Sequence, residues 1–431
     1  MKISLLSLVL ASMMSMQVQA APTASHNGYI IKLKKAVSAR SLSTLNSLGV
    51  QITNTIPELN LVVAQSNPQL NQKLQAQSAL IEYIEPNYYR HTIVAKKDIY
   101  DTNADALWGM KSINAAEAWR ITTGDPKVVV AISDTGVSQL HGDLQKNLFV
   151  NAGESGLDKN GKDKAKNNID DDGNGFIDDV NGWNFETNTK DPSDTHYHGT
   201  HVAGTIGAKG TDRNGITGVT WNSKLMSVKF ISSSGSGEDA AGAATIVYAA
   251  NNGAKVVNCS WGGDEPAKAI LDAIEYAGTK GTIVVAAAGN DGADIGKRPM
   301  YPAAYKADNL IVVAATTAGS KRELASFSNY NATLVHLAAP GDAIKSSFNP
   351  MYKTLYCESL FFCTLSGTSM AAPHVSGAIA LLYSVNPKLT VAQVKDVLLS
   401  TVTKSAKLEG KVASGGVLNI AEAVKKAKSL N

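Results

Sequence analysis

The sequence predicts an α/β protein with a mostly parallel sheet covered by helices on both faces, preceded by a small α+β unit. Its 431 residues suit one large α/β domain with an added unit. From Val128 onward, apolar runs of strand length alternate with helical segments. That order is typical of parallel sheets that carry helices on both faces. Residues 28 to about 92 alternate in the same way over a much shorter span.

The first 20 residues have the pattern of a cleavable signal peptide. Met1-Lys2 precedes an apolar stretch from Leu5 to Met14, and Val18-Gln19-Ala20 supplies a cleavage site after Ala20. That stretch is too short for a membrane span, and no later segment has enough unbroken apolar residues. We expect an exported, extracellular protein without a membrane anchor.

Residues 21–95 form the second predicted unit. Strands are expected at 28–33, 59–63 and 81–87, with helices at 38–48 and from Asn67-Pro68, where Asn caps the helix and Pro takes its first position. Such alternation gives a small sheet with two helices on one face. His91–Lys97 lacks periodicity and is interpreted as a connecting tail.

Residues 96–431 form the third and largest predicted unit, without repeats or a separate C-terminal module. A strand is expected at 128–133 and ends in Asp134. Further strands are expected at 225–229, 255–258, 282–287 and 310–314, and helices at 240–250, 268–277, 390–400 and 418–427.

Composition excludes several other classes of function. The net charge of +3 argues against a nucleic-acid partner, and the sequence lacks HExxH, GxxxxGK and CxxC motifs. Cys357 and Cys363 flank a short loop, so in an exported protein we expect a disulfide between them. Cys259 lies in an apolar strand and is interpreted as a small buried hydrophobic residue.

Three segments carry residues suited to nucleophilic catalysis. Asp134-Thr135-Gly136 follows a buried strand, where open α/β sheets build their sites. His198 opens a helix of small residues, which we expect to hold it at an exposed mouth while His201 turns inward. Ser369 lies in the first turn of a buried helix, whose dipole and free N–H groups stabilise negative charge. A lone serine there could simply cap the helix, but the other two segments favour catalysis.

These three segments, in the order Asp, His, Ser, closely resemble the subtilisin-like serine protease family. The resemblance implies a subtilisin-like fold with Ser369 as nucleophile, His198 as general base and then acid, and Asp134 as the carboxylate that fixes the histidine tautomer. Asn290 ends a predicted strand, and the resemblance implies that its amide donates to the oxyanion.

The resemblance also implies a secreted serine endopeptidase that acts on proteins or peptides as a monomer. Residues 21–95 then resemble an inhibitory propeptide that enters the active site, with self-cleavage within the tail 91–97. Backbone edges at Gly235 and at Ser260, Trp261 and Gly262 would grip an extended substrate.

The same resemblance gives a pocket for the residue before the cleaved bond. Ala287 and Gly289 line it together with Ser260–Gly262, and Met300 matches its floor. Because this floor has no carboxylate, we expect the pocket to accept substrate residues with uncharged, apolar side chains. It argues against an enzyme that cleaves after basic residues.

An acidic loop indicates a calcium site. Asp170, Asp172 and Asn174 match the first half of an EF-hand loop, although Asn181 replaces its final Glu. Carboxylates this dense, which include Asp178 and Asp179, repel one another unless a cation joins them. A solvated acidic turn is the alternative. Asp143 matches a ligand of a second family calcium site, but the companion loop 209–215 differs in length.

Other interpretations stay open at this point. A catalytically silent peptide-binding protein could keep this fold, and the same acyl-enzyme could ligate peptides if water were excluded. His196, His198 and His201 could form a metal cluster, but no carboxylate-rich surroundings accompany them.

Overall fold

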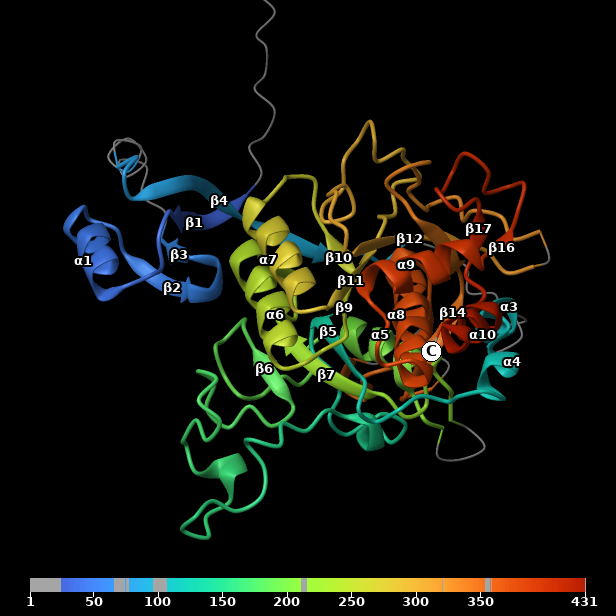
Figure 1. Cartoon of the computed structure of the whole chain (residues 1–431), viewed down its shortest axis with the longest axis horizontal. Helices are drawn as coiled ribbons and strands as arrows, with labels where there is room; N and C mark the ends of the chain where they lie inside the picture. The colour runs from blue at the N-terminus through green and yellow to red at the C-terminus, as the bar shows by residue number, and fades with distance from the viewer. Residues whose placement is uncertain are drawn as a thin grey trace, which may run out of the picture.

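The computed structural model describes residues 25–65, 74, 77–95, 107–210, 215–319, 321–352, 357 and 359–430. Its centre is a nine-stranded sheet in the order β16-β17-β13-β12-β11-β9-β5-β7-β6 (Figure 1). The neighbouring strands of this sheet pair in parallel except β16 and β17, so the prediction of a mostly parallel sheet is confirmed. The strands are β5 (Val129–Asp134), β6 (Gly182–Asn184), β7 (Lys224–Lys229), β9 (Val256–Cys259), β11 (Ile283–Ala287), β12 (Leu310–Thr316), β13 (Leu337–Pro340), β16 (Thr403–Lys404) and β17 (Gly416–Val417).

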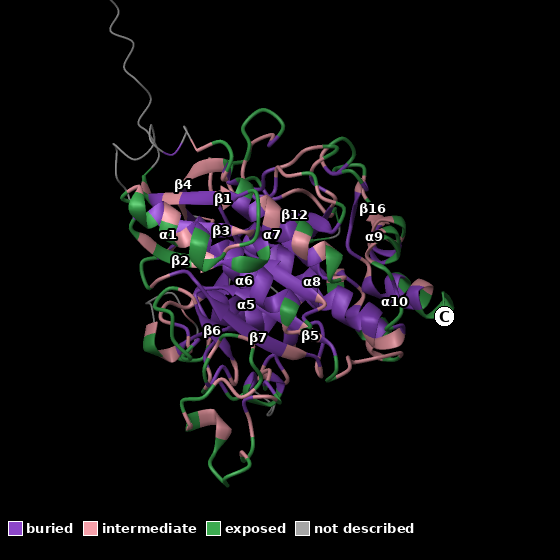
Figure 2. Cartoon of the chain, turned by 60° about the vertical axis from the view of Figure 1, so that its left-hand side comes forward, coloured by how far each residue is buried: buried purple, intermediate pink, exposed green. Residues whose placement is uncertain are grey.

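Helices cover both faces of the sheet because successive strand residues point to opposite sides. Ile283 and Val285 of β11 pack in the core that contains α5 (His198–Gly207) and α8 (Thr368–Val385). Val284 and Ala286 pack in the core that contains α6 (Asp239–Asn251) and α7 (Lys268–Thr279). Both cores are continuous, and Figure 2 shows the sheet, α5, α6 and α8 almost wholly buried. The smaller helices are α3 (Trp108–Ser112), α4 (Ala115–Trp119), α9 (Val391–Ser400) and α10 (Ile420–Ser429).

A two-stranded antiparallel sheet lies beside α5. It consists of β14 (Ile344–Ser347) and β15 (Phe362–Leu365). Cys357 and Cys363 form a disulfide next to it, which confirms the expected pair, and Cys259 is a buried free thiol.

The N-terminal unit is an antiparallel sheet that continues onto the large domain. Its elements are β1 (His26–Leu33), α1 (Ala39–Ser47), β2 (Ile52–Ile56), β3 (Leu61–Ala64) and β4 (Ile81–Thr92). β4 runs from the small unit into the body of the molecule, where it pairs with β8 (Ser236–Glu238) and β10 (Trp261–Gly262) (Figure 1). The sequence indicated a strand that ended at Asn87 and gave no sign of β2. The signal peptide and the start of the helix at Asn67-Pro68 lie outside the described residues.

The small unit packs against α6 and α7 and caps both helices. Neither helix has a side-chain cap of its own. The Glu85 carboxylate accepts hydrogen bonds from the backbone of Lys268 and Ala269 at the start of α7. Asn87 Oδ1 accepts one from Ala240 N at the start of α6. The N-terminal unit therefore satisfies backbone donors that the large domain leaves open.

In the described part of the chain, no helix combines the length and the apolar composition that crossing a membrane requires.

The contact between α8 and α5 depends on a glycine. A methyl group added at Gly377 of α8 would lie 2.6 Å from Val219 Cβ and 3.2 Å from the Ile206 carbonyl oxygen. Helix propensity favours Ala over Gly by about 1 kcal/mol, but overpacking a core costs about 1–3 kcal/mol. The packing effect should therefore outweigh propensity at this position.

We expect Gly377→Ala to lower the melting temperature. The measurement is thermal unfolding in a Ser369→Ala background, which prevents autolysis. Gly142→Ala is the control, because a methyl group there meets no atom within 4 Å. Equal or higher stability of Gly377→Ala would show that helix propensity dominates.

Candidate active site

The site lies at the carboxyl ends of the central parallel strands. Asp134 ends β5, which is flanked by β7 on one side and β9 on the other. After β5 the chain adds β6 and β7 on one side and then β9 and β11 on the other. Open α/β sheets bind ligands at such a point, where the strand order reverses. Asp134 is fully buried, and its Oδ1 accepts hydrogen bonds from Thr135 N (2.7 Å) and His198 Nδ1 (2.8 Å).

His198 is the first residue of α5, at the tip nearest Asp134. An ionised carboxylate can only accept, so the Nδ1 atom carries the proton of the neutral ring and Nε2 keeps its lone pair. Nε2 is buried and has no hydrogen-bond partner among the described residues. His198 itself is fully buried, so the expected exposed mouth is wrong for this form of the chain. The groove is occupied by the chain's own residues 91–95, as described below.

Ser369 lies in the first turn of α8, as predicted. Its hydroxyl donates to the carbonyl oxygen of Ser260 (2.8 Å), and Ser260 Oγ donates back to the Ser369 carbonyl (2.9 Å). The structure therefore gives the expected carboxylate–imidazole contact, but it does not give a hydrogen bond between imidazole and hydroxyl. Rotation about the Cα–Cβ bond of Ser369 moves its oxygen, and rotation about the Cβ–Oγ bond redirects its proton, so the hydroxyl can leave the Ser260 carbonyl without a backbone change.

Asn290 follows β11 and is held by a residue that the sequence analysis did not single out. Its Oδ1 accepts from both the backbone N and the hydroxyl of Thr368, each at 2.9 Å. These bonds fix the amide orientation, so Nδ2 donates to the carbonyl oxygen of Ile93 at 3.1 Å. In the sequence, the position of Thr368 next to Ser369 was the only indication that it belongs to the site.

Residues 91–95 lie extended between the two predicted backbone edges. Thr92 N donates to the Gly235 carbonyl (3.1 Å) and Ile93 N to the Ser260 carbonyl (3.4 Å). Beyond Ile93, Ala95 N donates to the Ser366 carbonyl (2.8 Å). Trp261 and Gly262 pair with Thr92 and His91 through their backbones. The indole of Trp261 instead points into the core, where it donates to Ser133 Oγ.

The Ile93 side chain is buried against the predicted pocket. A methyl group added at Gly262 would lie 3.1 Å from Ile93 Cδ1 and 3.0 Å from the Met300 sulfur. Ala287 belongs to the same apolar core as Ile93. Gly289 has φ +104°, and a side chain there would collide with Asn329, so this wall must be glycine. The pocket presents apolar surface to the residue that it holds.

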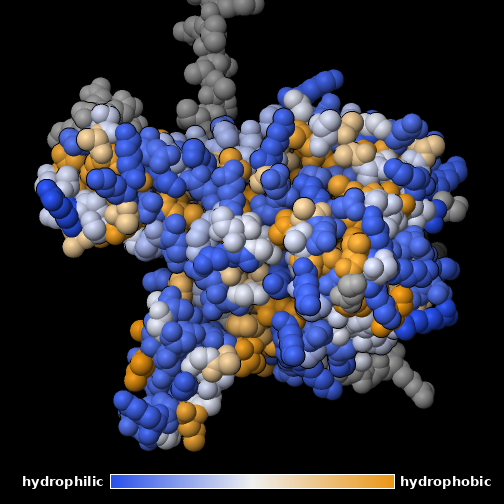
Figure 3. Space-filling model, in the orientation of Figure 1, coloured by the Kyte–Doolittle hydropathy of each residue, from blue (hydrophilic) through white to orange (hydrophobic). Residues whose placement is uncertain are grey.

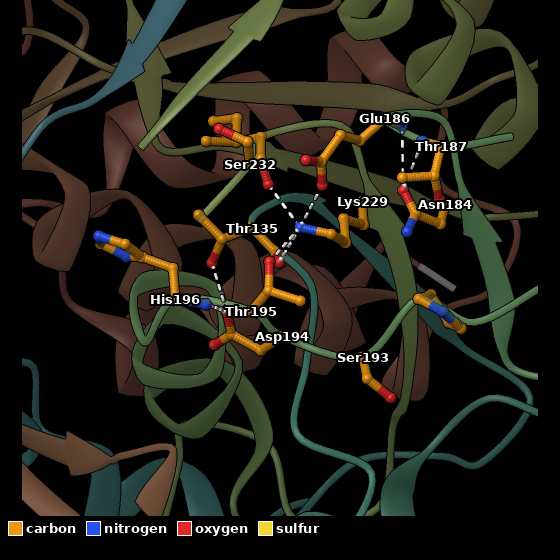
Figure 4. Close-up of polar contacts among 12 residues, drawn as sticks. Thr135, Asn184, Glu186, Thr187, Ser193, Asp194, Thr195, His196, Lys229 and Ser232 are labelled. Carbon is orange, nitrogen blue, oxygen red and sulfur yellow. Dashed lines mark hydrogen bonds and ion pairs between the residues drawn. The ribbon is translucent and has the colours of Figure 1, made fainter. Parts of the chain in front are cut away.

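Two buried charged residues tie the loops of the site together (Figure 4). Asp194 accepts from Thr135 Oγ1 (2.8 Å), from His196 N, and from both the backbone N and the hydroxyl of Thr200. Burial raises the pKa of Asp194 to about 6, while these donors lower it. Thr135 follows Asp134 directly, and Thr200 lies two residues after His198 in α5, so Asp194 joins the two segments.

Lys229, at the end of β7, strengthens the same link. Its ammonium group donates to the carbonyl oxygens of Thr135 and Ile231 and to Thr195 Oγ1, at 2.7–3.0 Å. It also pairs with Glu186 at 2.9 Å (Figure 4). A buried ammonium with four oxygen partners is satisfied, so this lysine positions loops and is not free to react.

The other histidines near the site are neutral structural groups. Burial lowers the pKa of His196 to about 4, of His201 to about 3 and of His374 to about 4. His201 Nε2 lies 3.1 Å from the carbonyl oxygens of both Ile344 and Cys363. Among the described residues these histidines form no group of metal ligands.

The acidic loop brings two of the expected residues, Asp170 and Asp172, together with Glu154. Carboxylate oxygens of Glu154, Asp170 and Asp172 lie within 4.8 Å of one another, and Glu154 was not predicted. Asp178 instead pairs with Lys190. Asp179 lies with Asn174, Asn151 and Tyr248, whose side chains all donate to it.

Asp143 lies elsewhere, beside the loop at 209–216. Its Oδ2 accepts from Ile216 N at 2.9 Å. Residues 211–214 of that loop are outside the described part of the chain, so the expected second calcium site falls partly outside it.

Comparisons with known proteins agree with this geometry. The sequence profile of the "Subtilase family" matches residues 125–418. The thermophilic serine proteinase of Bacillus sp. strain AK1 is 32% identical over 82% of this chain and 77% of that protein. Thermitase of Thermoactinomyces vulgaris is 35% identical over 64% of this chain and 82% of its own length.

A solved structure is similar over almost the whole chain. Fervidolysin from Fervidobacterium pennivorans, described as a keratinolytic enzyme related to subtilisin, superposes with a TM-score of 0.72 at 25% identity. The match covers 93% of this chain and 61% of fervidolysin.

The Asp194 network gives a test of how the site is held together. Asp194→Asn places an N–H₂ group against N–H and O–H donors, so one or two buried hydrogen bonds are lost. We expect the free energy of unfolding to fall by about 1–3 kcal/mol. Urea unfolding of Ser369→Ala protein measures it. Asp191→Asn is the matched control, because Asp191 is exposed and accepts one bond, from Ser193 N. Equal effects of the two substitutions would contradict this role.

Proposed function

Because this chain belongs to the subtilase family of serine endopeptidases, we propose that it is a secreted enzyme that cuts itself out of a precursor and then hydrolyses proteins. The observation that carries this proposal is the seating of residues 91–95 in the groove. The Ile93 carbonyl accepts from the Asn290 amide, while Ile93 N and Ala95 N donate to the carbonyl oxygens of Ser260 and Ser366.

In the proposed mechanism, His198 Nε2 takes the proton from the Ser369 hydroxyl as the oxygen attacks the substrate carbonyl carbon. Asp134 holds Nδ1–H and stabilises the imidazolium that forms. Asn290 Nδ2 donates to the carbonyl oxygen as it gains charge, and removal of such a donor in subtilisin lowers turnover about 10²–10³-fold. His198 then gives the proton to the leaving amine, and water hydrolyses the acyl-enzyme by the same route in reverse.

The position of the tail supports a particular bond for self-cleavage. The hydrogen bond from the Asn290 amide to the Ile93 carbonyl supports Ile93 as the residue whose carbonyl reacts, so the proposed cut lies between Ile93 and Val94. This lies within the tail 91–97 and moves the boundary of the proposed propeptide from 95 to 93. Residues 1–20, proposed as a signal peptide for secretion, lie outside the described residues.

The proposed propeptide would inhibit by occupying the groove as a strand. β4 fills the space between β8 and β10, and Glu85 and Asn87 anchor it to α7 and α6. The apolar pocket around Ile93 favours substrates with an uncharged, apolar residue before the cleaved bond.

A Ser369→Ala protein should remain an uncut precursor, because it lacks the attacking oxygen. Wild-type protein refolded alone should yield a mature chain that starts at Val94, detected by N-terminal sequencing and intact mass. Ser384→Ala is the control, because that residue lies on the same helix and, among the described residues, its hydroxyl bonds only to the Ala380 carbonyl of that helix. Maturation of Ser369→Ala without another protease would contradict self-processing, and absence of a phosphonate adduct on Ser369 in the mature wild type would contradict the proposed nucleophile.

We also propose a structural calcium ion at Glu154, Asp170 and Asp172. Their carboxylate oxygens are the hard ligands that calcium prefers, and burial together with Asp172 raises the pKa of Glu154. The loop that carries them projects from the body between β5 and β6 with a mostly hydrophilic surface (Figures 1 and 3). Backbone N–H groups already bond to Glu154 and Asp170, which orders the loop around these oxygens.

Calcium should therefore raise the melting temperature of the Ser369→Ala protein by mass action. At a calcium concentration of 100 times the Kd, the free energy of unfolding should rise by about 2.7 kcal/mol. Asp170→Asn should remove most of this gain. Asp171→Asn should keep it, because Asp171 is outside the cluster and accepts from Asn167. Equal melting temperatures in calcium and in a chelator would overturn the proposal.

A further inference from the structure

A buried ion pair joins β4 to the groove three residues before Ile93. Arg90 of β4 and Asp239, the first residue of α6, are 1% and 0% exposed. Arg90 Nη2 donates to Asp239 Oδ2 at 3.0 Å, and Nε donates to the other carboxylate oxygen. This is the two-pronged guanidinium–carboxylate geometry that combines charge with direction.

Arg90 enters this position because of strand register. β4 pairs with β8 so that Arg90 faces Gly237, and with β10 so that His91 faces Gly262. Arg90 and Ile93 are therefore held by the same backbone ladder that presents the Ile93 carbonyl to Asn290. His91, between them, is exposed. A substrate bound as a strand in the same register would place its fourth residue before the cleaved bond where Arg90 now lies.

The surroundings of Asp239 make an unpaired carboxylate costly. Burial raises the pKa of Asp239 to about 6, and Arg90 opposes this increase by charge and hydrogen bonding. Gly263 leaves room for the guanidinium, since a methyl group there would lie 2.7 Å from Arg90 Nη1. Once the propeptide leaves, Asp239 loses both hydrogen bonds from Arg90, and a substrate side chain with a planar cation and several donors would restore them.

We propose that Asp239 is a specificity residue of the mature enzyme, which selects substrates with arginine four residues before the cleaved bond and an apolar residue directly before it. This rests on the proposed function. The chain would thus combine an apolar pocket with a separate acidic one, so it differs from an enzyme that cleaves after basic residues. The competing explanation is that Asp239 serves only to dock the propeptide.

The test uses fluorogenic peptides with mature wild-type enzyme. The parent peptide has the sequence of residues 89–95, Tyr-Arg-His-Thr-Ile-Val-Ala. Replacing its Arg by Leu should lower kcat/KM at least about tenfold, because the buried Asp239 loses its partner. Replacing Arg by Lys should give an intermediate value, since an ammonium cannot make both bonds. Replacing the exposed His by Ala is the matched control and should change kcat/KM less than about threefold.

Enzyme variants assign the effect to Asp239. In Asp239→Asn the ratio of kcat/KM for the Arg and Leu peptides should fall close to one, whereas in Asp264→Asn, an exposed acid nearby, it should stay at the wild-type value. If Asp239→Asn does not mature, the wild-type peptide series still decides.

Equal cleavage of the Arg and Leu peptides by wild-type enzyme would overturn this inference and leave the proposed function standing. Failure to cleave any peptide, the parent included, would overturn the proposed function and this inference with it.

Discussion

The structure depends on one constraint: parallel strands deliver their carboxyl ends to a single edge of the sheet. β5 ends in Asp134, β9 leads into Ser260 and β11 leads towards Asn290. Because these strands are adjacent and parallel, Asp134, Ser260 and Asn290 come to the same edge of the sheet although they are far apart in sequence. The helices that follow at this edge then direct their N-termini, and with them His198 and Ser369, into the same space. The packing of the buried apolar strands thus determines where the polar residues of the site lie relative to one another.

The groove uses the remaining backbone of that edge as a sheet in its own right. β8 and β10 each present hydrogen-bonding groups that the large sheet does not use, and β4 satisfies both. When a peptide binds by adding a strand in this way, backbone hydrogen bonds hold it in place, and the pockets for its side chains determine which sequences bind. A shift of one residue would turn Arg90 and Ile93 out of their pockets, so the two buried side chains also fix the register of the bond presented to Asn290.

Sequence patterns predicted most of the fold, because both faces of the sheet are covered and its strands are continuous apolar runs. The segments of Asp134, His198 and Ser369 were recognisable since each joins a strand or helix end to small residues. The features that the sequence did not indicate are those formed by tertiary contacts. β4 extends beyond Asn87 only because β8 and β10 pair with it, and Glu154 joins Asp170 only because a loop folds back. Thr368, Asp194 and Lys229 act through bonds to residues distant in sequence, which leave no local pattern. The buried pair of Arg90 and Asp239 is of the same kind.

The contacts of the tail are unequal on the two sides of the Ile93–Val94 bond. The bonds of Thr92 and Ile93, the ion pair of Arg90, and the caps from Glu85 and Asn87 all lie on the side that would remain with the N-terminal unit. In the described tail, Ala95 N to the Ser366 carbonyl is the backbone bond on the other side. Cleavage at this bond would leave nearly all of these contacts intact, so the cut by itself would not detach the N-terminal unit. The contacts that present the Ile93–Val94 bond would then also hold the cleaved N-terminal unit in the groove. Cleavage of the bond and opening of the groove would therefore be two separate steps.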